Sequence, residues 1–317
     1  MSEWRRRKGV NVVLVAEEAA GIQTLRAILK TRHRIVGVVA SSQADAPQRG
    51  ATVRGVAEAN GCRIWPGTAV RDPHFGTILR EASVDVLLNV HSLRVIHPAV
   101  LEAPGIGSFN LHPGPLPEYA GLNAPSWAIY NGEPLHAVTV HWMTAEIDTG
   151  PIAFRQEIPT DDADTGLTLS AKCVRAGVPL LVKLLDVAEE DPAAIPSQPQ
   201  DGSRRRYYGR EVPDDGRLHW SQPADRIVRF VRACDYSPLP SPWGHPRTVI
   251  RGQPCEIVKA FRTRRACAAP AGTVGPVEND AAFVAAADEW VAISRLSLSG
   301  RALRAAEVLK TGACLED

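Results

Sequence analysis

The chain has 317 residues, of which 44% are hydrophobic and 22% charged, and its formal net charge is +1 at pH 7. This length suits two domains with a sizeable buried core, and the composition is that of an ordinary globular protein. The near-zero net charge gives no reason to expect a general attraction of the whole molecule to nucleic acid or to membranes.

The N-terminal segment has none of the features of a secretory signal, because residues 1–8 are charged and the apolar run behind them is only one strand long. No stretch approaches the ~20 apolar residues that span a bilayer. The six cysteines show no Cys-x-x-Cys spacing, which is typical of reduced thiols. We therefore expect a cytoplasmic protein with no membrane partner.

Short β-branched runs alternate with amphipathic stretches in the first part of the chain. The expected strands are 10–15, 35–40, 63–65 and 84–90, and the expected helices are 20–30, 52–60 and 73–82. Further strands are expected at 107–111 and 137–143, and further helices at 125–131 and 168–189. This alternation predicts an α/β fold, a Rossmann-like and mostly parallel sheet with helices on both faces.

The residue composition changes around residues 190–206, which form a polar connector that contains several prolines. Beyond it we expect one helix, 224–233, and short strands at 248–250, 255–260, 281–286 and 290–293. The pattern predicts a small β-rich C-terminal domain. We place the boundary so that the domains are residues 1–202 and 203–317.

Charge is distributed unevenly between these parts. Residues 203–265 carry 14 Lys and Arg against 6 Asp and Glu, whereas residues 1–202 carry 18 against 22. The basic segment 203–265 is either a solvated surface or a seat for an anionic partner.

The candidate chemistry lies at the end of the expected strand 107–111. Asn110 and His112 occupy alternate positions there, so their side chains point to the same side, and a proline- and glycine-rich loop follows. An asparagine amide can donate to a developing oxyanion, and a histidine can accept a proton near neutral pH. Asp148 follows the next strand on a turn before Gly150, where its carboxylate could orient an imidazole.

Three other kinds of site are disfavoured. A single Asp-Thr-Gly at 148–150 lacks the second copy and the all-β pattern that an aspartic protease needs. The nine histidines form no ligand-spaced cluster with Cys or carboxylates, so no metal is expected. No Gly-x-Gly-x-x-Gly follows the first strand, which argues against a Rossmann dehydrogenase. The residues alone therefore indicate an α/β enzyme with an Asn-His-Asp site.

The sequence resembles the folate-dependent formyltransferases, which include methionyl-tRNA formyltransferase, glycinamide ribonucleotide transformylase and the sugar N-formyltransferases. The family's Asn-x-His followed by a proline loop and an aromatic-x-Gly is matched by Asn110, His112, Pro117, Tyr119 and Gly121. Further family motifs are matched, in order, at 131–133, 137–141 and 148–152. More loosely, 204–220, 271–274 and 305–312 resemble the junction and the OB-like C-terminal module of the longer members.

The resemblance implies a formyl transfer from 10-formyltetrahydrofolate, as co-substrate, to an amine. His112 would assist removal of the amine's proton, Asn110 would hold the oxyanion, and Asp148 would orient the histidine or move the proton to the leaving nitrogen. The resemblance also implies a folate site made of two loops. Their residues are Ser92, Leu93, Arg94, Val95 and Ile96 in the first, and Thr144, Ala145, Glu146 and Ile147 in the second.

The acceptor amine is less well defined, because the chain departs from the family pattern close to the site. It has Gly114-Pro115 where many relatives have Ser-Leu, and Ala120 where many have Arg or Lys. The segment 41–54, which corresponds to a basic insertion in the tRNA-specific branch, holds two arginines and no lysine. We expect a small-molecule acceptor such as an amino sugar or a modified amino acid. Methionyl-tRNA formylation and hydrolysis of 10-formyltetrahydrofolate are the alternatives, and a binding module without activity is a further one.

Overall fold

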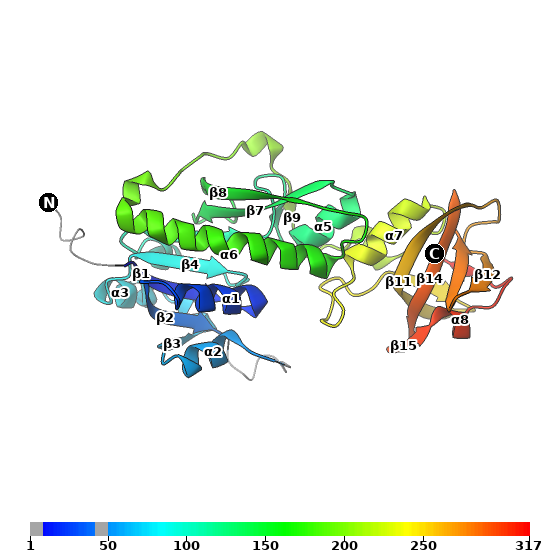
Figure 1. Ribbon diagram of the computed structural model, residues 1–317, viewed down its shortest axis with the longest axis horizontal. Coiled ribbons are helices and arrows are strands. Elements are labelled where there is room, and N and C mark those ends of the chain that lie inside the picture. Colours follow the sequence, from blue (N-terminus) through cyan, green and yellow to red (C-terminus); the bar gives the residue numbers. More distant parts are fainter. Residues whose placement is uncertain (1–8, 42–49) are drawn as a thin grey trace. The chain divides into compact units, whose positions relative to one another are not determined.

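The computed structural model describes residues 9–41 and 50–317 (Figure 1). The chain forms two compact units. The first unit contains the chain up to Gly121, then Ala137–Ile158 and Lys172–Tyr207, and the second contains Leu122–His136, Pro159–Ala171 and Tyr208–Asp317. Each unit is therefore built from separate stretches of sequence. The domain boundary expected between residues 202 and 203 remains a proposal.

The first unit is organised around a seven-stranded sheet with the order β3-β2-β1-β4-β5-β7-β8. Its strands are β1 (Asn11–Ala16), β2 (Arg34–Ala40), β3 (Ile64–Pro66), β4 (Val86–Val90), β5 (Gly107–His112), β7 (Leu135–Trp142) and β8 (Ile152–Pro159). The pairings from β3 to β5 are all parallel, and β7 runs antiparallel to β5. The expected mostly parallel sheet is confirmed. Sequence analysis did not predict β8, which pairs with β7 after a short turn.

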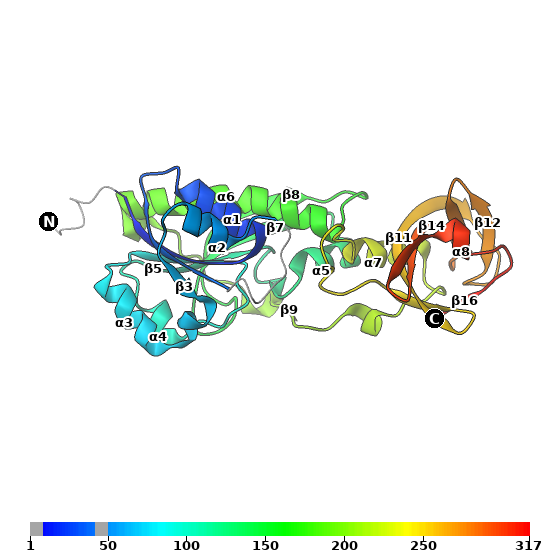
Figure 2. The same ribbon diagram turned by 90° about the horizontal axis from the view of Figure 1, so that it is seen from below.

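Helices cover both faces of this sheet, as predicted. They are α1 (Glu18–Ile28), α2 (Val53–Ala59), α3 (Pro73–Glu81), α4 (Pro98–Leu101) and α6 (Gly166–Glu190). In Figure 2, α3 and α4 lie on one side of the sheet and α1 on the other, together with α6. N-capping side chains define where α2 and α3 begin. Thr52 accepts a hydrogen bond from Gly55 N, and Asp72 accepts one from His74 N.

Close packing of α6 depends on a glycine. A Cβ at Gly177 would lie 2.7 Å from Leu111 Cδ1 and 3.0 Å from Val138 Cγ2, so the helix backbone approaches β5 and β7 without a side chain between. The apolar side chains of the sheet face α3 and α4 on the other side, where Val13, Phe75, Leu79 and Leu87 belong to one buried cluster. The strands β1, β4 and β5 are buried on both faces, which is why their sequences are nearly continuous apolar runs.

The second unit contains an antiparallel sheet with the order β12-β13-β14-β11-β10-β16, and β15 pairs with β14. Its strands are β10 (Arg247–Ile250), β11 (Gln253–Ala266), β12 (Val274–Glu278), β13 (Ala281–Ala285), β14 (Glu289–Leu298), β15 (Arg301–Arg304) and β16 (Leu315–Glu316). Its helices are α5 (Ala124–Asn131), α7 (Ala224–Ala233) and α8 (Ala305–Val308). The β-rich C-terminal part is therefore confirmed. The strands β11 and β14 are much longer than predicted, and β12, β15 and β16 were not predicted.

Aromatic rings pack where α5 meets α7 inside the second unit. Tyr130 packs edge-on against Phe230 at 5.3 Å between ring centroids, and Trp127 packs against Trp243 at 4.8 Å. Two short strands, β6 (Ala120–Gly121) and β9 (Tyr207–Tyr208), form a separate pair. Single 3₁₀ turns occur at Gly67–Arg71, Pro192–Ala194, Gly202–Arg204 and Pro213–Gly216.

Candidate active site

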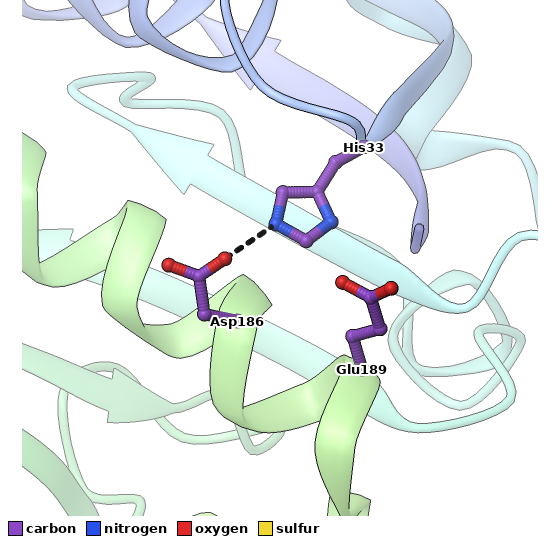
Figure 3. Close-up of side chains that lie close together, drawn as sticks. All are labelled: His33, Asp186 and Glu189. Atoms are coloured by element: carbon purple, nitrogen blue, oxygen red, sulfur yellow. Dashed lines mark hydrogen bonds and ion pairs between the residues drawn. The ribbon is translucent and has the colours of Figure 1, made fainter. Parts of the chain in front are cut away.

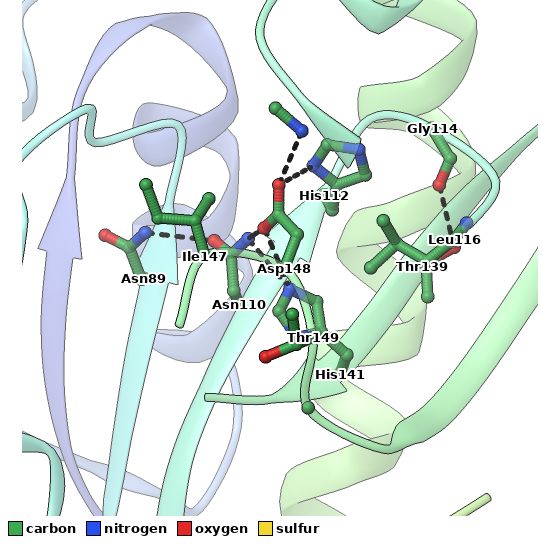
Figure 4. A network of polar contacts seen from close by, with 12 residues as sticks. Asn89, Asn110, His112, Gly114, Leu116, Thr139, His141, Ile147, Asp148 and Thr149 are labelled. Carbon is green, nitrogen blue, oxygen red and sulfur yellow. Dashed lines mark hydrogen bonds and ion pairs between the residues drawn. The ribbon is translucent and has the colours of Figure 1, made fainter. Parts of the chain in front are cut away.

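Three polar side chains form a row across neighbouring strands of the first unit. The register places Asn89 of β4 beside Asn110 of β5, and Asn110 beside His141 of β7. Asn89 Nδ2 donates to Asn110 Oδ1 at 2.9 Å, and Asn110 Nδ2 lies 3.1 Å from His141 Nε2 (Figure 4). Because adjacent strands put paired residues side by side, the row is a direct product of the sheet register.

His112 ends β5 and is 3% exposed. Its Nε2 lies 2.6 Å from the Tyr119 carbonyl oxygen, and its Nδ1 lies 3.5 Å from Asp148 Oδ2. A carbonyl oxygen can only accept, so Nε2 carries a proton and donates to Tyr119. In the neutral ring Nδ1 then holds the lone pair, and this atom is the basic one that faces Asp148 (Figure 4).

The proline- and glycine-rich loop behind His112 is tied to the neighbouring strand. Thr139 of β7 is paired in register with His112, and its hydroxyl donates to the Gly114 carbonyl at 2.7 Å. The Thr139 hydroxyl oxygen also accepts from Leu116 N at 3.4 Å. These bonds hold the loop that delivers the Tyr119 carbonyl to the imidazole.

Asp148 brings the carboxylate to this point from the turn between β7 and β8. It is 9% exposed, and its Oδ2 accepts from Gly121 N at 2.8 Å. Its Oδ1 lies 3.5 Å from Asn110 Nδ2 and 3.4 Å from His141 Nε2. The structure therefore brings the three predicted residues Asn110, His112 and Asp148 together.

The backbone of Asp148 is in the left-handed region, with φ of +54°. This conformation is uncommon for non-glycine residues, although aspartate adopts it more readily than most. Here Gln200 Nε2 donates to the Asp148 carbonyl at 3.0 Å and to the Gly150 carbonyl at 2.6 Å. Arg205 adds bonds to the Ile147 and Asp148 carbonyls at 2.9 and 3.3 Å.

Burial and charge set the protonation states of the pair. Burial lowers the pKa of His112 below its ordinary value, against the opposing effect of the Asp148 carboxylate. Burial alone would raise the pKa of Asp148, but the nearby His112 and His141 together with the Gly121 N–H lower it below its usual range. At neutral pH the site therefore combines an ionised carboxylate with a neutral imidazole, the form that can accept a proton.

The two loops expected to hold folate lie next to this site in the chain and differ in exposure. In the first loop Leu93 and Val95 are 79% and 65% exposed, whereas Ser92 and Ile96 are buried and Arg94 donates to Ser41 Oγ at 2.9 Å. In the second loop Thr144 to Ile147 are exposed, and the Thr144 hydroxyl bonds the Glu146 carbonyl at 3.1 Å. Their role in binding stays a prediction.

Another polar cluster of the first unit joins His33 to Asp186 and Glu189 of α6 (Figure 3), and their candidate ligand atoms lie within 4.8 Å of one another. Val10 N donates to His33 Nδ1 at 3.2 Å, so Nε2 carries the proton and donates to Asp186 at 3.2 Å. Arg32 forms an ion pair with Glu189. Because protein donors already face these atoms, the cluster is a contact that ties the start of β1 to the end of α6.

Sequence reasoning overlooked several residues that shape the candidate site. His141 was noted only as part of a motif, and Asn89, Gln200 and Arg205 were not singled out. Asn89 and His141 each lie near the end of an expected strand, so a position-by-position register of the three strands would have found them. No such signal exists for Gln200 and Arg205, which lie in the irregular connector.

Two family models match the chain. The formyl transferase family matches residues 5–185, and the family's C-terminal domain matches residues 212–312. The chain is 30% identical to the methionyl-tRNA formyltransferase of Synechococcus sp. (strain JA-3-3Ab) over 308 residues, covering 92% of each protein.

Solved structures share the fold at lower identity. A sugar 3N-formyl transferase, WlaRD, solved in the presence of dTDP and 5-N-formyl-THF, has a TM-score of 0.68 at 17% identity, covering 93% of this chain and 100% of its own. The N-formyltransferase of Helicobacter canadensis, in complex with folinic acid and dTDP-3-aminofucose, has a TM-score of 0.67 at 18% identity, covering 90% and 98%. HypX of Aquifex aeolicus, in complex with tetrahydrofolic acid, has a TM-score of 0.64 at 17% identity, covering 95% of this chain and 47% of that one. Given the extent of the family match, the chain belongs to the formyl transferase family.

Proposed function

We propose that the protein is an N-formyltransferase that moves the formyl group of 10-formyltetrahydrofolate to the amine of a small molecule. The observation that carries the proposal is the meeting of a neutral imidazole, an ionised carboxylate and an asparagine amide around one point. Bound 10-formyltetrahydrofolate would supply a formyl carbon attached to a nitrogen that can leave.

His112 Nδ1 is the atom placed to remove the proton of an attacking amine. Its partner nitrogen is already used by the Tyr119 carbonyl, so the ring cannot turn without losing that bond. Once Nδ1 is protonated, the Asp148 carboxylate 3.5 Å away stabilises the positive charge. A positioned base typically contributes roughly 10²–10⁴-fold to a rate.

Asn110 Nδ2 is the donor available for negative charge on the formyl oxygen. This nitrogen lies 3.1 Å from His141 Nε2 and 3.5 Å from Asp148 Oδ1. The longer of these contacts is weak, so a formyl oxygen can take over that hydrogen, and the half-buried Asn110 leaves room for a ligand to reach it. Removing a donor of this kind costs roughly 10²–10³-fold in kcat.

The surroundings of the site suit a flat, partly apolar co-substrate. Leu93, Val95 and Ile147 are large apolar side chains that the protein leaves 79%, 65% and 51% exposed. Exposed apolar groups on loops beside a polar centre are typical of ligand pockets. The solved relatives that hold folinic acid or tetrahydrofolic acid support the same class of ligand.

The charges of the basic segment 203–265 favour a small acceptor over tRNA. Arg226 stacks over Tyr130, Arg229 pairs with Asp225, and Arg262 pairs with Glu289. Arg265 pairs with Glu278. Arginines that are paired with carboxylates leave less uncompensated positive charge for a phosphate backbone. The segment 41–54, whose scarcity of basic residues was also counted against tRNA, lies partly outside the described residues, at 42–49.

Formylation of methionyl-tRNA is the second candidate, and it is favoured by the 30% identical methionyl-tRNA formyltransferase. The two candidate functions are distinguished by an acceptor assay. The full chain is incubated with 10-formyltetrahydrofolate and, in parallel, with charged methionyl-tRNA, nucleotide-linked amino sugars or free amino acids. Mass spectrometry then looks for the gain of one formyl group. We expect a small amine to be the best acceptor, judged by kcat/KM.

Two results would contradict the proposal. A kcat/KM for methionyl-tRNA far above that of every small amine would assign the tRNA reaction. Formate release at the same rate with and without an amine would assign a hydrolase. The Asp148→Asn variant serves as the control for background formyl transfer.

A further inference from the structure

We infer that Asn89 is a positioning residue, which sets the orientation of the Asn110 amide and so makes Nδ2, not Oδ1, the atom offered to the reaction. The inference rests on the proposed function, since it concerns the donor of that reaction. Asn89 was not among the residues that the sequence pattern singled out.

An asparagine side chain does not define its own orientation. Its amide has two nearly isosteric ends, one that only donates and one that only accepts, and nothing in the residue itself selects which end faces a ligand. A flipped Asn110 would present a carbonyl oxygen to the developing oxyanion, which would repel it. The surrounding hydrogen bonds must therefore choose the orientation.

One end of the row is fixed by a backbone carbonyl. Asn89 Nδ2 donates to Ser92 O at 3.3 Å, and Ser92 O can only accept, so this end of the Asn89 amide is its NH₂ group. The second hydrogen of that NH₂ group points to Asn110 at 2.9 Å. The atom of Asn110 that it meets must accept, and this atom is Oδ1.

The other end of the row faces a carboxylate. His141 Nδ1 lies 2.8 Å from the Trp142 carbonyl and donates to it, and His141 Nε2 lies 3.1 Å from Asn110 Nδ2 and 3.4 Å from Asp148 Oδ1. The ionised Asp148 carboxylate can only accept, and its Oδ1 lies 3.5 Å from Asn110 Nδ2, so it favours the NH₂ group at this end of the Asn110 amide. The Ser92 carbonyl and the Asp148 carboxylate thus favour the same orientation of Asn110, and Asn89 transmits the effect of Ser92.

Burial strengthens this effect. Asn89 is 7% exposed and His141 is 2% exposed, so water is a poor substitute for either partner. The Oδ1 atom of Asn89 has no protein hydrogen-bond partner among the described residues. The Asn89 amide therefore acts through its NH₂ group, which donates both hydrogen bonds, to Ser92 O and to Asn110 Oδ1.

The test removes the donor while keeping the side chain's size. We expect Asn89→Leu to lower kcat roughly 10- to 100-fold, the range seen when the supporting partner of a site residue is lost, and to leave the KM for 10-formyltetrahydrofolate within about twofold. Asn89→Asp, which accepts but does not donate when ionised, should reverse the Asn110 amide and lower kcat at least as far. Ser108→Ala removes another buried hydrogen bond, from β5 to the Leu101 carbonyl, and serves as the matched control with kcat near wild type.

Two measurements separate positioning from general damage to the fold. If Asn89 acts through Asn110, then Asn89→Leu should have no further effect on kcat in an Asn110→Ala background. In ¹⁵N NMR spectra the side-chain NH₂ signals of Asn110, assigned by their loss in Asn110→Ala, should shift in Asn89→Leu. Wild-type kcat in Asn89→Leu, fully additive effects in the double variant, or unshifted Asn110 signals would overturn the inference.

These outcomes remain distinct from failure of the proposed function. The NMR measurement needs neither co-substrate nor turnover, so it tests the orientation of Asn110 even if the protein transfers no formyl group. If wild-type protein is inactive with every amine while the Asn110 signals shift as expected, the positioning stands and the proposed reaction is wrong.

Discussion

At the scale of single residues, backbone carbonyls decide the chemistry of the candidate site. The Tyr119 carbonyl selects the tautomer of His112, and the Trp142 carbonyl makes Nδ1 of His141 a donor. The sequence led us to expect that Asp148 orients the histidine. In the structure the Tyr119 carbonyl makes the shorter contact to the ring, and Asp148 faces the basic nitrogen.

Substitution of the central pair should remove turnover without unfolding the protein. We expect His112→Gln and Asp148→Asn each to lower kcat by at least ~100-fold, because the first removes the proposed base and the second leaves its protonated form without a counter-charge. Circular dichroism should show an unchanged fold. Formyl transfer at the wild-type rate by either variant would show that these residues are not the catalytic ones.

The acid limb of the pH profile should report on His112. Because burial lowers the pKa of His112 from its ordinary value of 6.5, kcat/KM should be flat at neutral pH and fall only below that value. The Asp148 carboxylate opposes this lowering, so in Asp148→Asn the pKa of His112 should move still lower. Titration of His112 by NMR, or the acid limb of residual activity, measures the shift. A shift upward would contradict the assigned contact.

The same pKa has a consequence for stability. Between the folded and unfolded pKa values of His112, the unfolded chain binds more protons than the folded protein. The contribution of neutral His112 to the free energy of unfolding is therefore complete above pH 6.5, and it is lost as the pH falls toward the folded value. Urea unfolding across this range should show the decline in wild type and a smaller one in His112→Gln.

At the scale of elements, the site depends on strand register and on the connector that follows the sheet. The row from β4 through β5 to β7 needs parallel pairing on one side of β5 and antiparallel pairing on the other. The connector around residues 190–206 contacts two parts of the site. Gln200 and Arg205 bond the Asp148 turn, and the Arg206 backbone pairs with Pro117 O and Ala120 N of the loop behind His112.

Loss of the connector's side chains should therefore impair catalysis from outside the reacting groups. We expect Gln200→Ala combined with Arg205→Ala to lower kcat roughly 10- to 100-fold, because a displacement near 1 Å of a catalytic group has effects of this size. Ser203→Ala, an exposed position in the same connector, is the matched control. Unchanged kcat in the double variant would show that the left-handed conformation of Asp148 does not need these bonds.

At the scale of the whole molecule, the chain is interleaved between its compact units. Residues 122–136 and 159–171 precede the connector in sequence yet belong to the second unit. Within that unit Tyr130 of α5 packs against Phe230 of α7, and Arg232 of α7 donates to the Asp164 carbonyl at 2.9 Å. Among the described residues no helix is long and apolar enough to cross a membrane.

A protein cut after residue 202 should therefore be unstable, although it keeps Asn110, His112 and Asp148. The cut leaves Trp127 and Tyr130 without Phe230 and Trp243. We expect no cooperative thermal transition for the fragment. In the full chain, Phe230→Ala should lower the free energy of unfolding by about 3–5 kcal/mol, the usual cost of removing a buried aromatic ring. A fragment that unfolds cooperatively and keeps activity would support the boundary at 202 instead.

Much of the fold and part of the site could be predicted from the sequence. Buried parallel strands are continuous apolar runs, so β1, β2, β4 and β5 were found within one or two residues. The strand β8 was missed because its residues 155–157, Arg-Gln-Glu, are exposed and break the apolar pattern. Asn110 and His112 could be found because they share one strand end, and Asp148 because it follows a family-like motif.

The sequence by itself determined the residue types of the site and the family to which the chain belongs. The tertiary structure alone decided which nitrogen of His112 is basic, which end of the Asn110 amide faces Asp148, and what holds Asp148. These depend on contacts between residues far apart in the chain, such as Asn89 with Asn110 and Gln200 with Asp148. Local patterns carry no record of such contacts, because hydrogen-bond direction is set by the three-dimensional neighbours of each atom.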